Sequence, residues 1–224
     1  MALELYLVRH GKTVFNATGR LQGWSDSPLL PESRTAAYEL GQALAATQVS
    51  FDAAFSSTSP RASETAQLIL QGCGQMNLPL TTLPELREYC FGGLEGELAS
   101  KVHQLIAADR GFTDIESWLT AYRHATSHLL AESVSKLDPL QIAETESQFT
   151  GRLKKGLQLL VEKSPCHGKV LLICHGMSIS AILKSINWQS TPYKSVENTT
   201  VSRLIFQNDK WEILSIGEVI RLPQ

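Results

Sequence analysis

Short apolar runs alternate with stretches of helical periodicity along this chain, and the alternation restricts the fold more than any other feature. A short apolar run bounded by turn signals is typical of a buried strand, and helices between such strands indicate parallel pairing. The predicted strands are residues 3–8, 51–57, 169–174, 200–206 and 211–216. The predicted helices are residues 32–47, 60–70, 141–163 and 177–186. We therefore expect an α/β three-layer sandwich, with a mostly parallel central sheet flanked by helices.

Two regions depart from this regular alternation. Asn208-Asp209 lies between the last two predicted strands and is a hairpin signal, so this pair should be antiparallel. Residues 95–140 are helical in pattern but more polar and less regular, and we interpret them as a helical cap insertion over one face. Because no linker or repeat interrupts the chain, residues 1–224 are expected to form a single domain.

Composition limits the partners of such a domain. Apolar residues make up 43% of the chain and the net charge is −2, so an ordinary core is possible and no basic excess suggests a nucleic acid partner. The four cysteines form no C-x-x-C pair, and Cys174 should be a buried thiol inside a strand. No apolar run is long enough to span a bilayer, and no signal peptide pattern is present. A cytoplasmic protein without a membrane partner is expected, and its oligomeric state stays open.

The chemistry is concentrated where two predicted strands end. One strand runs into Arg9-His10-Gly11, and another runs into His175-Gly176. Ligands of open α/β sheets bind at the carboxyl ends of the strands, so both histidines should meet there. The helix that begins at Met177 should point its N-terminal amides toward the same place, where they favour an anion.

Arg61 follows a third strand and should reach the same edge of the sheet. A guanidinium group can donate to two phosphate oxygens at once, so Arg9 and Arg61 are candidates for a phosphate clamp. Two arginines and two histidines would then form a local positive site in a chain that is slightly negative overall.

These motifs belong to an ordered series that extends over most of the chain. The series resembles the histidine phosphatase superfamily, in its phosphoglycerate mutase-like branch. It consists of Arg9-His10-Gly11 with Thr13, Asn16, Arg20, Gln22-Gly23 and Asp26-Ser27-Pro28-Leu29, then Ser57 to Ala62 with Thr65-Ala66, Leu86-Arg87-Glu88 with Phe91-Gly92 and Leu94-Glu95-Gly96, and finally Glu146-Ser147, Arg152, His175-Gly176 and Asn198-Thr199.

The resemblance implies a phosphoglycerate mutase-like fold and a role for each matching residue. His10 would be the nucleophile that forms a covalent phosphohistidine, and Glu88 the general acid and base. Arg9, Arg61 and His175 would bind the phosphoryl oxygens and stabilise transition-state charge. The other positions expected to bind substrate or phosphate are Asn16, Gln22, Gly23 and Gly176. No metal and no cofactor is implied.

Some assignments stay open at this point. Glu85 and Glu95 lie close to Glu88 in sequence, and only the resemblance favours Glu88 as the acid. Lys12 and Arg20 either bind substrate or are ordinary exposed charges, and Trp24 either forms a wall of the pocket or packs. His124 and His128 have helical spacing, and solvated helix residues are a better interpretation than metal ligands because no third ligand accompanies them.

Three functions remain possible on the sequence alone. A phosphomonoesterase acting on a small phosphorylated metabolite is favoured, because the chain reads Glu88-Tyr89-Cys90-Phe91-Gly92 where mutases of the family have Arg-His-Tyr-Gly after the glutamate. The adjacent arginine pair of mutases is also absent from residues 95–140, where Arg110 and Arg123 stand apart. Phosphoglycerate mutase-type phosphoryl transfer is the alternative. The third possibility is a regulatory module that binds a phosphate ligand without turnover.

Overall fold

A six-stranded mixed sheet forms the centre of the computed structural model, which describes residues 2–189, 191 and 193–222. The strand order is β3-β2-β4-β1-β5-β6. The strands are β1 (Ala2–Arg9), β2 (Ala53–Ser57), β3 (Leu80–Leu83), β4 (His167–Cys174), β5 (Val201–Gln207) and β6 (Lys210–Glu218). The first four pair in parallel, whereas β5 runs antiparallel to β1 and β6 antiparallel to β5. The expected parallel sheet with a final antiparallel hairpin is confirmed.

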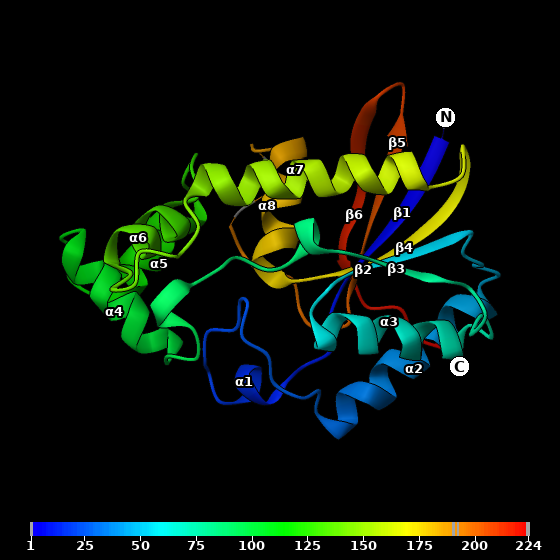
Figure 1. The fold of residues 1–224 in the computed structure, drawn as a ribbon, viewed down its shortest axis with the longest axis horizontal. Helices are drawn as coiled ribbons and strands as arrows, with labels where there is room; N and C mark the ends of the chain where they lie inside the picture. The colour runs from blue at the N-terminus through cyan, green and yellow to red at the C-terminus, as the bar shows by residue number, and fades with distance from the viewer. Residues whose placement is uncertain (1, 190, 192, 223–224) are drawn as a thin grey trace.

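Helices cover both faces of this sheet (Figure 1). The helices are α1 (Val14–Ala17), α2 (Pro31–Ala46), α3 (Pro60–Gly72), α4 (Ala99–Asp109), α5 (Ile115–Arg123), α6 (Leu129–Leu137), α7 (Glu146–Lys163) and α8 (Gly176–Ile186), with 3-10 turns η1 (Pro84–Leu86) and η2 (Gly92–Leu94). Helices α2 and α3 lie on one face, and α7 and α8 lie on the other (Figure 1). The predicted α/β sandwich is therefore confirmed.

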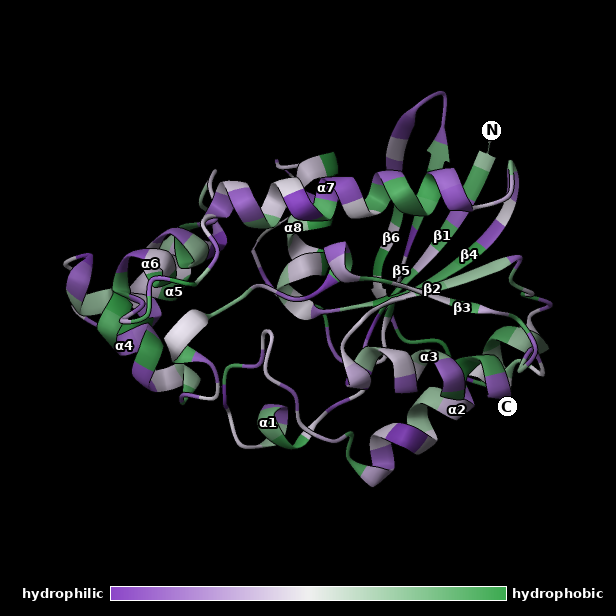
Figure 2. Cartoon of the chain, in the orientation of Figure 1, coloured by the Kyte–Doolittle hydropathy of each residue, from purple (hydrophilic) through white to green (hydrophobic). Residues whose placement is uncertain are grey.

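Strand β1 shows why the sheet is apolar on both faces. Successive side chains of a strand point to opposite faces, and here Leu5 and Leu7 pack toward α7 and α8 while Tyr6 and Val8 pack toward α2 and α3. All four side chains are buried. Figure 2 shows the same pattern, since apolar residues predominate in the central strands. Parallel strands covered on both faces are expected to be apolar throughout.

The start of one helix and one edge strand depart from the sequence prediction. The helix expected from residue 141 begins instead at Glu146, because Thr145 caps it and forms a capping box with Gln148. Strand β3 was not predicted, because its two central residues are threonines and it lies at the edge of the sheet, so it lacks the apolar run of a buried strand.

The segment expected to be a cap forms three short helices, α4, α5 and α6, at one end of the molecule (Figure 1). Their buried side chains include Val102, Ile106, Trp118 and Val134, and these belong to the same hydrophobic cluster as the α7 side of the sheet. No helix within the described residues is long and apolar enough to cross a membrane.

The histidines expected to be solvated on one helix are separated in the structure. His124 follows the end of α5 and is exposed, whereas His128 precedes α6 and is completely buried. The prediction was wrong for His128, because its ring packs among Tyr89, Tyr122, Phe149 and Tyr193.

Candidate active site

Three neighbouring strands deliver their following residues to one edge of the sheet. Arg9, the last residue of β1, is aligned with Cys174, the last residue of β4. His10 and His175 therefore leave their strands side by side, and their ring centroids are 5.2 Å apart. Strand β2 ends at Ser57, and Arg61 lies in the first turn of the helix that follows. The structure thus brings together the four residues expected to form the positive site.

His10 is buried and has one ring nitrogen engaged. Its Nδ1 lies 2.8 Å from the carbonyl oxygen of Gly11, to which it donates as the neutral tautomer, and this leaves the Nε2 lone pair unprotonated. Burial and the charges of Arg61 and Arg9 hold the pKa of His10 well below its usual value. A neutral imidazole with a free Nε2 has the electron pair that a nucleophile needs.

The backbone around His10 is held from two sides. Asn198 donates from Nδ2 to the carbonyl oxygen of His10 at 2.8 Å, and Thr65 accepts at Oγ1 from the amide of Gly11 at 3.0 Å. Both partners are distant in sequence, so the position of His10 depends on the tertiary fold and not on its own loop.

His175 is also buried, and both of its ring nitrogens have partners. Arg61 donates from Nη2 to Nδ1 at 3.2 Å, so Nδ1 is an acceptor and the proton is on Nε2. That Nε2 lies 2.6 Å from the Oγ of Ser57, to which it donates. Burial, with the charge of Arg61, lowers the pKa of His175 well below its usual value. His175 is therefore neutral and held in one tautomer.

Arg61 is buried because a loop of residues 22–26 surrounds its guanidinium group. Nη1 donates to the carbonyl oxygen of Ser25 and to Asp26 Oδ1 at 2.7 Å, and Nη2 donates to the carbonyl oxygen of Gly23 at 2.8 Å. Asp26 keeps 29% of its side-chain surface exposed, so the ion pair is at the edge of the buried region.

Arg61 and Arg9 each have one buried donor without a partner. Arg9 donates from Nη1 to the carbonyl oxygen of Val196 at 2.6 Å. The Nε atoms of Arg9 and Arg61 are both buried, and neither has a hydrogen-bond partner among the residues that the structure describes. Unpaired buried donors of charged groups are costly, and such groups in native proteins often mark a functional site.

Glu88 is a buried carboxylate at the N-terminus of α8. Its Oε1 accepts from the amides of Tyr89 and Ser178 and from the Ser178 hydroxyl, and its Oε2 accepts from the Met177 amide at 2.9 Å. Burial raises the pKa of Glu88 above its usual value, although these hydrogen bonds oppose the rise. A carboxyl group with a raised pKa is suited to donate a proton.

The two competing carboxylates have other partners. Glu85 is paired with Lys155 at 3.2 Å. Glu95 accepts hydrogen bonds from the amides of Gly23, Trp24, Ser25 and Phe91 and from the Ser25 hydroxyl. Glu88 alone of the three lines the cavity described below. Geometry therefore supports the choice that the sequence could make only through the resemblance.

A cavity of about 360 Å³ opens between this edge of the sheet and the cap. Of the residues predicted to form the site, Arg9, Asn16, Gln22, Glu88 and Gly176 line it. His10, Arg61 and His175 are buried and are not among its lining residues. The cap contributes His103, Leu119, Tyr122, Arg123 and Leu130 to the wall.

Several neighbouring residues have roles that the sequence left open. Arg20 lines the cavity, whereas Lys12 is exposed and does not. Gly23, which was expected to bind substrate, is not among the lining residues, and it is closely packed, since a Cβ there would lie 1.9 Å from the carbonyl oxygen of Tyr89. Trp24 also lies outside the lining, and its Nε1 donates to the carbonyl oxygen of Glu88 at 3.0 Å.

Sequence reasoning missed two positioning residues. Ser57 contacts His175, and Arg152 donates to the carbonyl oxygens of Glu85, Arg87 and Glu88 while it is paired with Glu144 at 2.6 Å. Both residues belong to the matching motif series, but their roles depend on contacts across the fold that no local pattern reveals.

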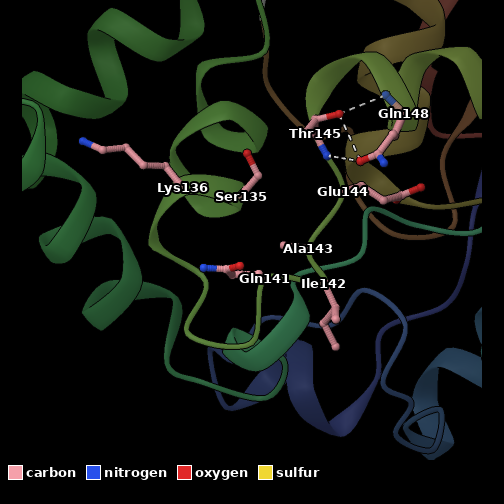
Figure 3. Close-up of a pocket in the computed structure, with 8 residues that line it drawn as sticks. All are labelled: Ser135, Lys136, Gln141, Ile142, Ala143, Glu144, Thr145 and Gln148. Carbon is pink, nitrogen blue, oxygen red and sulfur yellow. Dashed lines mark hydrogen bonds between the residues drawn. The ribbon is translucent and has the colours of Figure 1, made fainter.

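A separate hollow of about 890 Å³ lies between the end of α6 and the start of α7 (Figure 3). It contains none of the predicted site residues. Its lining residues are Ser135, Lys136, Gln141, Ile142, Ala143, Glu144, Thr145 and Gln148. Within the described residues, no group of three or more His, Cys, Asp or Glu side chains is arranged to hold a metal ion.

Comparisons with known proteins identify the superfamily of the chain. The family model of the histidine phosphatase superfamily, branch 1, matches residues 5–219, and the chain belongs to that superfamily. It is 32% identical over 193 residues to a 2,3-bisphosphoglycerate-dependent phosphoglycerate mutase of Hamiltonella defensa, with 82% of this chain and 77% of the relative covered.

Solved structures share the fold of the whole chain. The phosphoglycerate mutase from Bacillus anthracis superposes with a TM-score of 0.90 at 32% identity, with 97% of this chain and 93% of that chain covered. The putative alpha-ribazole-5'-P phosphatase from Escherichia coli superposes with a TM-score of 0.72 over all of both chains, at 22% identity. The fold is thus shared by proteins named as mutases and as phosphatases.

Proposed function

We propose that the protein is a phosphomonoesterase that hydrolyses a small phosphorylated metabolite through a phosphohistidine on His10. The observation that carries the proposal is the combination at the strand ends: a neutral imidazole with a free Nε2, near two arginines whose Nε–H groups are buried and unpaired among the described residues. Donors of this kind match the oxygens of a phosphoryl group. No group in this set needs a metal to act.

The reaction would proceed in two displacements. The Nε2 of His10 attacks phosphorus, the ester P–O bond breaks, and the leaving alkoxide takes a proton from Glu88. A water molecule then attacks the phosphohistidine while the Glu88 carboxylate accepts its proton, and inorganic phosphate leaves with His10 restored. Arg9 and Arg61 would stabilise the charge on the phosphoryl oxygens in both steps, and Asn16 would add a neutral donor.

The residues after Glu88 support water as the acceptor of the phosphoryl group from His10. Tyr89 is buried, and its single hydroxyl proton is donated to the carbonyl oxygen of Glu144 at 2.6 Å, with the carbonyl oxygen of Ala131 at 3.1 Å as a second acceptor in range; Cys90 is buried as well. Neither side chain offers a cation to a second phosphorylated substrate. Arg110, in the cap, is bonded to Ser133 and Glu132 and does not line the cavity.

Phosphoglycerate mutase-type transfer is the second candidate. It is favoured by the relatives named as mutases at 32% identity and by Arg20, Arg123 and Lys194, three cations that line the cavity. A mutase would interconvert phosphoglycerates in the presence of a bisphosphoglycerate primer, and it would release little phosphate to water.

A panel of metabolite phosphates, with p-nitrophenyl phosphate as a generic substrate, tests these proposals by phosphate release without added metal. We expect wild type to release phosphate, His10→Ala to lose turnover, and His167→Ala, at an exposed histidine, to keep it. Turnover that persists in His10→Ala would refute the phosphohistidine. Primer-dependent interconversion without net release would favour the mutase, and neither activity would favour a ligand-binding module.

A further inference from the structure

The cap presents two neutral hydrogen-bond donors to the cavity, and the two displacements use neither of them. Tyr122, on α5, and His103, on α4, line the same cavity as Arg9, Asn16 and Glu88. The phosphoryl chemistry takes place at the strand ends, so the cap side of the cavity faces the part of the substrate that is not phosphate.

The ring of Tyr122 is fixed between two other aromatic rings. Trp118 stacks on one side with centroids 5.6 Å apart, and Tyr193 stacks with centroids 5.2 Å apart and an interplanar angle of 8°. Only 7% of Tyr122 is exposed, although the residue lines the cavity. The phenol is therefore held in one orientation before any ligand binds.

His128 determines the direction of the Tyr122 hydroxyl proton. The amide of Ala131 donates to His128 Nδ1 at 3.2 Å, so Nδ1 is an acceptor and the proton of the neutral ring is on Nε2. The Tyr122 hydroxyl oxygen lies 3.3 Å from that Nε2 and 3.5 Å from Nδ1. Because the Ala131 amide already occupies the Nδ1 lone pair, the hydroxyl oxygen accepts from Nε2–H in this tautomer. The phenol proton must then point to another acceptor. Burial lowers the pKa of His128 to about 4 and raises that of Tyr122, so both groups keep these protonation states at neutral pH.

The ring of His103 is held in one tautomer in the same way. Trp118 donates from its indole Nε1 to His103 Nδ1 at 3.1 Å, which places the proton of the neutral ring on Nε2. Burial lowers the pKa of His103, so the ring stays neutral. Each of the two donors is thus fixed by a partner behind it and keeps one N–H or O–H for a ligand.

We infer that Tyr122 and His103 bind an acceptor oxygen, a hydroxyl or carboxylate, on the leaving-group side of the substrate. The inference rests on the proposed function and makes the cap the part that selects the substrate. It predicts a preference for phosphomonoesters whose carbon skeleton carries such an oxygen. A ligand without that oxygen would leave the fixed donor unpaired, which costs binding free energy.

A matched pair of substrates tests this inference: glycerol 1-phosphate, which carries hydroxyls, and propyl phosphate, which has the same carbon skeleton without them. Tyr122→Phe removes only the hydroxyl. We expect it to lower kcat/KM for glycerol 1-phosphate by about three- to tenfold, the effect of one neutral hydrogen bond, and to leave propyl phosphate unchanged. His103→Gln should likewise lower kcat/KM for glycerol 1-phosphate relative to propyl phosphate. Tyr38→Phe, at an exposed tyrosine of α2, should not.

An equal loss on both substrates, or no change on either, would overturn the inference. Failure of the proposed function has a different signature, since wild type would then release phosphate from neither ester. In that case calorimetric binding of glycerol 1-phosphate decides the matter: weaker binding by Tyr122→Phe than by wild type supports the inference, and equal affinity refutes it.

Discussion

Ser57 Oγ lies 2.6 Å from Nε2 of His175, a contact that connects the ends of β2 and β4. Because Arg61 donates to the other ring nitrogen, Ser57 accepts the hydrogen bond from the Nε2–H that defines the tautomer of His175. Ser57 is completely buried, so the hydrogen bond is shielded from water. The contact makes His175 a group of fixed orientation beside the nucleophile.

Ser57→Ala should therefore reduce catalysis without removing any group that contacts phosphate. We expect kcat/KM on p-nitrophenyl phosphate to fall by about three- to tenfold, the effect of one lost neutral hydrogen bond. Ser56→Ala is the control, because Ser56 is equally buried but bonds to the carbonyl oxygen of Ser57 and to Ser63. Equal activity of Ser57→Ala and wild type would show that His175 needs no such support.

Substitution of Glu88 and substitution of Glu95 should lower kcat/KM in ways that depend differently on the leaving group of the ester. If Glu88 protonates the leaving oxygen, Glu88→Gln should slow an alkyl phosphate far more than p-nitrophenyl phosphate, whose leaving group needs little help. Glu95→Gln loosens the loop of residues 22–26 around Arg61, so both substrates should slow by a similar factor. Comparison of kcat/KM for the two esters distinguishes the roles, and equal losses in Glu88→Gln would contradict the assignment.

The pH dependence of the alkyl phosphate reaction should follow the protonation of Glu88. A general acid acts in its protonated form, and burial raises the pKa of Glu88, so the acid stays active to a higher pH than an ordinary glutamate would. Activity should fall as the pH rises through that raised value. In Glu88→Gln this basic limb should disappear from the profile, whereas in Glu97→Gln, at a partly exposed glutamate paired with Lys101, it should persist.

His128 should make the fold sensitive to acid. Its pKa is lowered from 6.5 to about 4 by burial, so this contribution to stability is fully present above pH 6.5 and is lost as the pH falls toward 4. The loss amounts to about 3 kcal/mol for this residue. His128→Asn, which keeps a side chain suited to cap α6, should lose less stability than wild type between pH 7 and pH 4 in urea unfolding. His124→Asn, at an exposed position, should behave like wild type.

Alanine substitution at two glycines should change the stability of the fold in opposite directions. A Cβ at Gly23 would lie 1.9 Å from the carbonyl oxygen of Tyr89, so Gly23→Ala should destabilise the fold by about 1–3 kcal/mol or more and reduce activity. Gly151 lies in α7, and a Cβ there would point into open space, with no contact within 4 Å, so Gly151→Ala should stabilise by about 0.5–1 kcal/mol. Thermal unfolding measures both, and a stable, active Gly23→Ala would refute the packing argument.

The sequence predicted the parts of the molecule that local patterns control. Strand ends at His10 and His175 could be located because an apolar run followed by a polar turn is a local signal, and parallel strands place such ends together. Glu88 could be chosen only by resemblance, because Arg152 and the amides of Met177 and Ser178 position it from distant elements. The burial of His128 was missed for the same reason, since its aromatic neighbours come from four separate segments.

The two arginines of the site also have a thermodynamic consequence. Burial is the main cause of the lowered pKa values of Arg9, His10 and His175, and the charge of Arg61 lowers each of them further. With both histidines neutral, the like charges at the ends of the strands are those of Arg9 and Arg61, and Glu88 and Glu197 act on Arg9 in the opposite direction. Any anion that binds there relieves the repulsion, and by mass action it raises the free energy of unfolding in proportion to the logarithm of its concentration. The melting temperature of this protein should thus depend on the choice of buffer and be higher in phosphate than in a buffer whose anions do not fit the site.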